Sequence, residues 1–162
     1  MHCVVSDTTA LIIFAKTDTL FFLTNLFEDI CIPQAVYDEL IIKDDLVRYR
    51  IKAFDALKIE KLKEEDIAKC MSGFKLDKGE TAAILLALEK EGLLIIDEKK
   101  GRRVAQEQGL KTVGILGILI ENYRKNFIDI DEVRLYFTLF KEQGLRISVE
   151  LERYFFEKLN KM

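Results

Sequence analysis

The 162-residue chain has no tryptophan, one proline and one histidine, and none of its apolar stretches is long. A helix that spans a bilayer needs roughly 20 consecutive apolar residues, so the sequence predicts no membrane-spanning helix. The first apolar run is short and no basic segment precedes it, which predicts a strand rather than a signal peptide. We therefore expect a cytoplasmic protein.

The scarcity of reactive side chains argues against covalent catalysis. The histidine is His2, and neither a Gly-x-Ser-x-Gly elbow nor a glycine-rich phosphate loop is present. Cys3, Cys31 and Cys70 make an odd number, and the first two lie in strand-like runs, which predicts reduced thiols in the core. A soft-metal site of His2 and Cys3 lacks further ligands at a recognisable spacing. Nucleophilic mechanisms are thus disfavoured.

The overall composition is that of one globular domain, which we expect to cover residues 1–162. Hydrophobic residues make up 49% and charged residues 33%, and no linker rich in Pro, Gly or Ser divides the chain. The formal net charge of -3 argues against a broad basic face for long nucleic acids. A local exception consists of Lys99, Lys100, Arg102 and Arg103. Either a solvated helix start or phosphate binding explains this cluster.

Short apolar runs alternate with helical periodicity along the chain. The predicted strands cover about residues 2–6, 30–32, 58–62, 93–96 and 111–113. The predicted helices cover about 8–15, 21–26, a segment that starts at Pro33 and carries Glu39, 64–72, 81–91, 99–108, a segment from 114, 131–143 and 149–158, and residues 43–56 form either an exposed helix or an ordered excursion. Gly92 and Gly109 are expected to end helices in the left-handed conformation. The alternation predicts an α/β fold with a central parallel sheet flanked by helices, which the helices from about 131 complete.

Four acidic residues lie near predicted strand ends or in the helices that follow them. They are Asp7, Glu39, Glu80 and Asp97. Because the carboxyl ends of parallel strands share one edge of the sheet, these side chains are expected to converge. Carboxylates are the ligands that Mg²⁺ and Mn²⁺ prefer, and such ions activate water and neutralise charge on a phosphate. The pattern predicts a metal-dependent nuclease.

Each acid also has a purely structural explanation. Asp7 and Asp97 could cap helices, Glu80 could complement a helix dipole, and Glu39 could be an exposed helical glutamate. The convergence of all four is stronger evidence than any one of them, although acids are common at these positions for capping reasons.

Five neighbouring residues could share in such a site. Asp77 is a fifth ligand or, as we favour, the N-cap of the helix that carries Glu80. Glu98 replaces Asp97 if the strand register shifts by one residue. Ser6 and Thr8 could hydrogen-bond a carboxylate or a bound water. Arg102 is the best candidate for holding a phosphate, with an ordinary surface role as the alternative.

Several segments together resemble one known family. They are residues 5–12 (Val-Ser-Asp-Thr-Thr-Ala-Leu-Ile), 32–40 (Ile-Pro-Gln-Ala-Val-Tyr-Asp-Glu-Leu), 76–84 (Leu-Asp-Lys-Gly-Glu-Thr-Ala-Ala-Ile), 95–105 (Ile-Ile-Asp-Glu-Lys-Lys-Gly-Arg-Arg-Val-Ala), 114–119 (Gly-Ile-Leu-Gly-Ile-Leu) and 144–148 (Gly-Leu-Arg-Ile-Ser). They are similar to the PIN domain family of VapC-type toxins and related ribonucleases, in its branch with Ser-Asp-Thr and Gly-Glu motifs. The similarity covers nearly the whole chain and implies the three-layer PIN-like fold.

The resemblance also implies a site and partners. Asp7, Glu39, Glu80 and Asp97 correspond to the family's acidic metal-binding set, and the family cleaves RNA with Mg²⁺ or Mn²⁺. Many members have aspartate at the position of Glu80 and a Thr-x-Asp sequence near the fourth acid. Toxin members are blocked by a small antitoxin and often form homodimers, so the resemblance implies an antitoxin partner and a homodimer.

The favoured hypothesis is therefore an endoribonuclease, the toxin of a toxin-antitoxin pair, whose four acids hold one or two divalent ions. Thr8, Lys99 and Arg102 would contact the RNA, and activity would fall as salt rises. A second hypothesis is a catalytically silent module that binds protein or RNA. A third is a phosphate-accepting receiver domain, which is disfavoured because only Asp7 follows the first strand.

Overall fold

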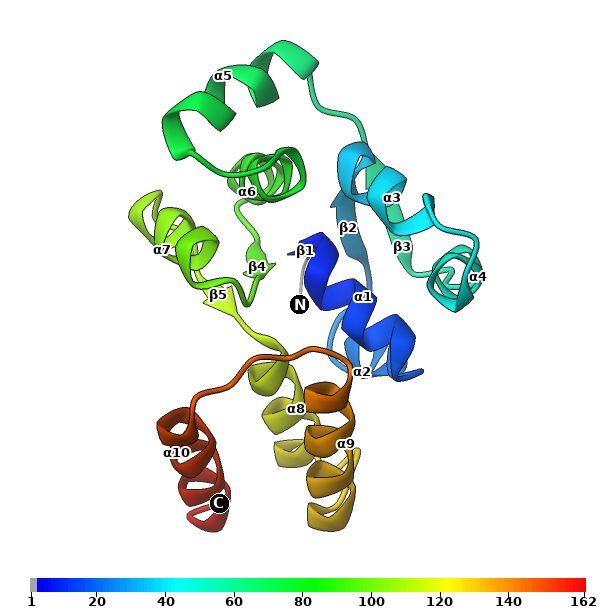
Figure 1. Cartoon of the computed structure of the whole chain (residues 1–162), viewed down its shortest axis with the longest axis vertical. Helices are drawn as coiled ribbons and strands as arrows, with labels where there is room; N and C mark the ends of the chain where they lie inside the picture. Colours follow the sequence, from blue (N-terminus) through cyan, green and yellow to red (C-terminus); the bar gives the residue numbers. More distant parts are fainter. Residues whose placement is uncertain (1–2) are drawn as a thin grey trace.

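Five parallel strands form the central sheet of the computed structural model, which describes residues 3–162 (Figure 1). They are β1 (Val4–Ser6), β2 (Ile30–Pro33), β3 (Leu57–Glu60), β4 (Leu93–Ile95) and β5 (Thr112–Val113), in the order β3-β2-β1-β4-β5. The predicted α/β fold with a central parallel sheet is confirmed. The sequence places the first strand from residue 2, but His2 and its suggested site with Cys3 lie outside the described residues.

Ten helices accompany the sheet within residues 3–162, and every predicted helical segment is present with shifted ends. They are α1 (Thr8–Lys16), α2 (Phe21–Thr24), α3 (Gln34–Ile41), α4 (Leu46–Lys52), α5 (Glu64–Phe74), α6 (Lys78–Lys90), α7 (Lys99–Glu107), α8 (Ile115–Arg124), α9 (Ile130–Glu142) and α10 (Val149–Asn160). No helix in this part of the chain is both long and apolar enough to cross a lipid bilayer.

The core lies between the sheet and the helices that cover it. β1 and β2 are buried along their whole length, which explains their continuous apolar sequence. α6 packs against β1, β2 and β4. Towards the C-terminus, Phe140 of α9 packs edge to face on Phe14 of α1, with ring centroids 5.8 Å apart. This contact fixes α9 on the N-terminal half of the fold, at the lower end of Figure 1.

The strand order reverses between β1 and β4. The chain runs outward from β1 through β2 to β3, and then returns to place β4 and β5 on the other side of β1. Ser6 pairs with Ile95, and the N–H of Asp7 donates a hydrogen bond to the carbonyl of Ile95 at 3.1 Å. Asp7 and Asp97 therefore leave the sheet side by side at the reversal, where open α/β sheets commonly bind ligands.

Two details of the helix ends differ from the prediction. Glu91, with φ 52°, takes the left-handed conformation expected of Gly92. Gly92 instead permits close approach, because a Cβ there would lie 3.0 Å from the carbonyl oxygen of Cys3. Pro33 is the N-cap of α3 rather than its first helical residue. Gly109 has φ +89°, as expected of a left-handed helix end.

Candidate functional site

Asp7 follows β1 directly and is almost completely buried, with 2% of its surface exposed. Its Oδ1 accepts a hydrogen bond from the N–H of Ala10 at 3.0 Å and so caps α1. Burial raises the pKa of Asp7 to about 7, although the Ala10 hydrogen bond opposes the shift, and the charges of Asp97, Asp77 and Glu39 raise it further. A buried carboxyl group beside three other acids lacks a compensating positive charge.

Asp97 lies two residues beyond β4 and is half-buried. Its Oδ2 accepts a hydrogen bond from the N–H of Ile115 at 2.9 Å, which ties the site to the start of α8. A Cβ at Gly114 would lie 2.6 Å from Asp97 Oδ1, so the glycine leaves room for the carboxylate. Burial raises the pKa of Asp97, while the hydrogen bond from Ile115 and the charge of Arg102 oppose the shift.

Glu98, the alternative to Asp97 in the sequence, caps a helix. Its carboxylate accepts hydrogen bonds from the N–H groups of Lys100 at 3.1 Å and Gly101 at 2.6 Å, so it caps α7. Burial opposes the change, but these N–H groups lower the pKa of Glu98. The N–H of Asp7 binds the carbonyl of Ile95, two residues before Asp97, and the charge of Asp97 raises the pKa of Asp7, so we take Asp97 as the candidate acid beside the end of β1.

Glu39 lies in the last turn of α3 and meets α1 and α6 there. A Cβ at Gly79 would contact Glu39 Oε1 and would lie 3.2 Å from Thr8 Oγ1. Burial raises the pKa of Glu39, and the charge of Asp77 adds to the effect. The hydroxyl of Thr8 lies close to this carboxyl group, but it is buried and has no partner with acceptable hydrogen-bond geometry among residues 3–162.

Glu80, in the first turn of α6, turns towards α7. A Cβ at Gly101 would lie 3.0 Å from Glu80 Oε2 and 3.3 Å from Glu98 Oε2. Within the described chain, Glu80 Oε2 is buried and has no hydrogen-bond partner. Burial raises the pKa of Glu80 to about 8, and the neighbouring Asp77 and Glu98 raise it further. No donor of residues 3–162 therefore reaches this buried oxygen.

The sequence predicts the capping role of Asp77 but not its effect on the neighbouring acids. It is the N-cap of α6, as favoured, and its Oδ1 accepts a hydrogen bond from the N–H of Glu80 at 2.8 Å. Its charge also raises the pKa values of Asp7, Glu39 and Glu80. In the sequence, the position of Asp77 three residues before Glu80 is the one indication that the two side chains lie close together. We call Asp7, Glu39, Asp77, Glu80 and Asp97 the acidic cluster.

The carboxylate groups of the acidic cluster are suitable ligands for a hard divalent cation, but they do not form a complete binding site in this structure. Among residues 3–162, no three His, Cys, Asp or Glu side chains converge closely enough to hold one ion. Asp7, Asp77 and Asp97 are each held by the start of a helix. All donors are carboxylate oxygens, their burial favours protons or cations, and Glu80 Oε2 has no partner in the described chain.

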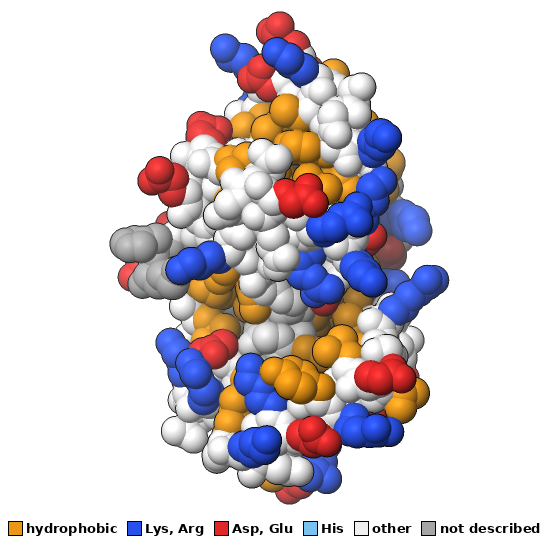
Figure 2. Space-filling model, turned by 90° about the vertical axis from the view of Figure 1, so that its left-hand side faces the viewer, with side chains coloured by type: hydrophobic (Ala, Val, Ile, Leu, Met, Phe, Trp, Pro, Cys, Tyr) orange, Lys and Arg blue, Asp and Glu red, His pale blue; other side chains and the backbone are white. Residues whose placement is uncertain are grey.

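Basic side chains lie beside the acidic cluster on α7. Arg102 is near enough for its charge to act on the carboxyl group of Asp97. A shallow cavity of about 600 Å³ is lined by Glu98, Lys99, Lys100, Arg102, Arg103 and Gln106. Figure 2 shows Lys and Arg side chains gathered at the height of α7 on this face. The arrangement offers positive charge for a phosphate next to the carboxylates.

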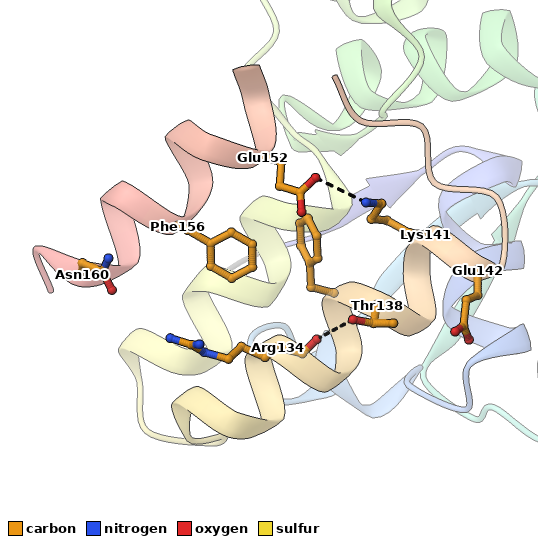
Figure 3. Close-up of a pocket in the computed structure, with 8 residues that line it drawn as sticks. Arg134, Thr138, Lys141, Glu142, Glu152, Phe156 and Asn160 are labelled. Atoms are coloured by element: carbon orange, nitrogen blue, oxygen red, sulfur yellow. Dashed lines mark hydrogen bonds and ion pairs between the residues drawn. The ribbon is translucent and has the colours of Figure 1, made fainter. Parts of the chain in front are cut away.

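A separate cavity of about 560 Å³ lies between α9 and α10 (Figure 3). Lys141 spans it, with its Nζ 3.3 Å from Glu152 Oε2 and 5.6 Å from the ring centroid of Phe137. Its lining residues are Arg134, Phe137, Thr138, Lys141, Glu142, Glu152, Phe156 and Asn160. None belongs to the acidic cluster, so this cavity is not the candidate site.

Comparisons with known proteins bear on the family and the fold of the chain. A family model described as PIN domain matches residues 3–161. One chain of the crystal structure of VapBC2 from Rickettsia felis, bound to a DNA fragment from their promoter, aligns with a TM-score of 0.51 and 13% sequence identity. The alignment covers 70% of this chain and 98% of that chain, and at this identity it shows the fold alone. No curated protein matches the sequence.

Proposed function

Because the chain belongs to the PIN domain family, we propose that it is a single PIN-like domain acting as a Mg²⁺- or Mn²⁺-dependent endoribonuclease that hydrolyses RNA phosphodiester bonds. The observation that carries the proposal is the placement of Asp7 and Asp97 beside each other at the reversal of strand order, where burial raises the pKa values of both. Such a pair stabilises the fold poorly by itself, but it suits a cation and a phosphate.

The four predicted acids take the ligand role in this proposal. Asp7 and Asp97 would hold the ion at the sheet edge, and Glu39 and Glu80 would complete the set from α3 and α6. When bound, a divalent ion neutralises developing charge and lowers the pKa of its water. The helix starts that bind Asp7 and Asp97 keep both carboxylates oriented.

The polar neighbours of the acidic cluster would position the RNA. Arg102 and Lys99 would bind the phosphate backbone at the cavity on α7. The buried hydroxyl of Thr8, which has no partner in residues 3–162, would donate to a carboxylate or to a phosphate oxygen. These contacts would hold the scissile phosphate next to the carboxylates. Arg102, Lys99 and Thr8 would bind the RNA without transferring a proton to or from it.

We also propose that the chain is the toxin of a toxin-antitoxin pair and forms a homodimer. Family membership supports this, and a similar solved structure is that of VapBC2. Val149, Leu151 and Tyr154 of α10 are exposed and offer apolar surface for self-association. Induced expression should arrest bacterial growth in the wild type and not in Asp7→Asn. Light scattering should give twice the chain mass, and a monomer mass would refute the homodimer.

The test of the nuclease is cleavage of a mixed RNA pool by the purified chain in Mn²⁺, Mg²⁺ or EDTA. We expect cleavage that requires metal and disappears in Asp7→Asn and in Asp97→Asn. Asp131→Asn, at an exposed position of α9, is the matched control and should cleave like the wild type. These isosteric changes remove one negative charge each and keep an oxygen that can accept the helix-capping hydrogen bond.

If no RNA is cleaved, the effect of Mn²⁺ on the melting temperature distinguishes a nuclease with a narrow substrate from a protein without activity. If RNA is not cut but Mn²⁺ raises the melting temperature of the wild type and not of Asp7→Asn, the site binds metal and the substrate is narrow. If neither cleavage nor a metal effect is seen, the enzyme proposal fails. The silent protein- or RNA-binding module is then the better account.

A further inference from the structure

Two arginines of α4 each bind the end of a neighbouring helix. The guanidinium of Arg48 donates to the carbonyls of Ile41 at 2.6 Å and Ile42 at 3.3 Å, at the end of α3. The guanidinium of Arg50 donates to the carbonyls of Ala15 at 2.7 Å and Lys16 at 3.2 Å, at the end of α1. α1, α3 and α4 contact one another pairwise (Figure 1). α4 thus brackets the two helices that carry Asp7 and Glu39.

The two helix ends depend on their arginines to different degrees. The last carbonyls of a helix have no partner inside it. At the end of α1, the N–H of Asp18 also donates to the carbonyl of Ala15, at 3.3 Å, and Thr17 binds the carbonyl of Ile13 through its N–H at 3.1 Å and its hydroxyl at 2.8 Å. At the end of α3, Arg48 is the sole side chain in residues 3–162 that donates to Ile41 and Ile42. The last turn of α3 therefore relies on Arg48.

Glu39 lies in that same last turn, whereas Asp7 lies at the opposite end of α1. The rise of about 1.5 Å per residue puts Glu39 roughly 3 Å along the axis from Ile41 and Asp7 roughly 12 Å from Ala15. On its other side Glu39 lies against Gly79, where an added Cβ would contact Glu39 Oε1. Fraying at the end of α3 would move Glu39 directly, while fraying at the end of α1 would leave Asp7 in place.

We propose that Arg48 is a positioning residue for Glu39. It closes the last turn of α3 and so keeps the Glu39 carboxylate at the acidic cluster, although it touches neither metal nor RNA itself. The inference rests on the proposed function of the acidic cluster as a metal site. It assigns to α4, which contributes no acid, a role in the geometry of that site.

Arg50 provides a closely matched control. Both arginine side chains are 31% exposed, and each lies near one exposed aspartate, Asp44 at 3.7 Å from Arg48 and Asp18 at 3.8 Å from Arg50. Substitution of either by methionine removes a charge, a weak ion pair and two hydrogen bonds to carbonyls. A purely structural role predicts the same outcome for both variants, whereas the positioning role predicts a difference in amide exchange at Glu39 and in metal binding.

The experiment compares Arg48→Met, Arg50→Met, Arg48→Lys, Glu39→Gln and the double variant Arg48→Met/Glu39→Gln in the full chain. Mn²⁺ affinity is measured by calorimetry, the melting temperature is measured without metal, and amide exchange is followed at Glu39 and Leu40. We expect both methionine variants to lower the melting temperature similarly. Arg48→Met alone should speed exchange at Glu39 and weaken Mn²⁺ binding on the order of tenfold, the size typical of residues that orient metal ligands.

Two further readouts sharpen the result. Arg48→Lys, which can still donate to one carbonyl, should recover part of the affinity. In the Glu39→Gln background, Arg48→Met should cause no additional loss, because its effect acts through Glu39. Equal Mn²⁺ affinity of Arg48→Met and Arg50→Met would overturn the inference while the metal site stands. Failure of the wild type to bind Mn²⁺ would instead refute the proposed function, and the inference with it.

Discussion

The carboxylate of Glu39 occupies the space that a side chain at Gly79 would need. A Cβ at Gly79 would contact Glu39 Oε1 and would lie 3.2 Å from Thr8 Oγ1. Gly79 is buried in the first turn of α6, immediately before Glu80. The absence of a side chain at this position is what lets the carboxylate of Glu39 lie against the start of α6.

Gly79→Ala should therefore impair the site more than the fold. The added methyl group displaces the flexible end of Glu39, so we expect Mn²⁺ affinity and kcat/KM for RNA to fall on the order of tenfold. The melting temperature should change little, because alanine favours a helix over glycine by about 0.5–1 kcal/mol and offsets the crowding. Calorimetric titration with Mn²⁺ and thermal unfolding without metal measure the two effects separately.

Gly73→Ala is the control for this change. Gly73 lies in α5, and a Cβ there meets no atom within 4 Å. We expect a slightly higher melting temperature and unchanged metal binding. Wild-type Mn²⁺ affinity in Gly79→Ala would show that Glu39 is free to move without consequence, and would remove it from the ligand set.

The position of the sheet-edge acids could be predicted because buried parallel strands have a clear signature. Val4-Val5 and Leu93 to Ile96 are continuous apolar runs, and a strand enclosed on both faces requires such a run. The acid after each run then falls at the carboxyl edge whichever way the helices pack. This placement needs no knowledge of long-range contacts.

The helix-borne part of the site could not be predicted in the same way. Asp77 has the spacing of an ordinary N-cap, and only the packing of α6 beside α1 and α3 brings its charge near three other acids. Arg48 looks like an ordinary helical arginine in sequence, because its partners are backbone carbonyls that carry no sequence signal. Side-chain orientation at helix ends is decided by tertiary contacts.

Asp97→Asn and Glu98→Gln should separate the two adjacent acids by function. Asp97 is half-buried, and its charge acts on Asp7, whereas Glu98 binds the N–H groups of Lys100 and Gly101. We expect Asp97→Asn to abolish the Mn²⁺-induced rise in melting temperature. Glu98→Gln should keep that rise and lose about 1 kcal/mol of stability as a weakened N-cap. The reverse pattern would make Glu98 the ligand.

Arg102→Gln should weaken RNA binding more than the chemical step. Arg102 lines the cavity on α7, and its charge acts on Asp97. We expect a KM for RNA several-fold higher, a nearly unchanged kcat, and a weaker dependence of kcat/KM on salt concentration. Arg103→Gln is the neighbouring control, because Arg103 is exposed and lies 3.9 Å from Glu107. Equal effects of the two changes would mean that Arg102 contributes only positive charge and makes no specific contact with the RNA.

The raised pKa of Asp7 makes the stability of the metal-free protein depend on pH. The pKa is about 7 in the folded chain, against an ordinary value of 3.8. Between these values the folded protein holds a proton that the unfolded chain has released, so the free energy of unfolding decreases as pH rises. The stabilisation is complete below about pH 4 and is lost above about pH 7.

Urea unfolding in EDTA at a series of pH values from 5 to 8 should reveal this loss. We expect the wild type to become less stable across the series by up to a few kcal/mol, since one pKa unit corresponds to about 1.4 kcal/mol. Asp7→Asn should show a flatter profile, whose remaining slope comes from Glu80 because its pKa is also raised, to about 8, and its stability should exceed that of the wild type most clearly at pH 8. Saturating Mn²⁺ at pH 8 should restore the wild type alone, because the cation replaces the lost proton. Parallel profiles for wild type and Asp7→Asn would mean that the buried carboxyl group of Asp7 is not the group that titrates.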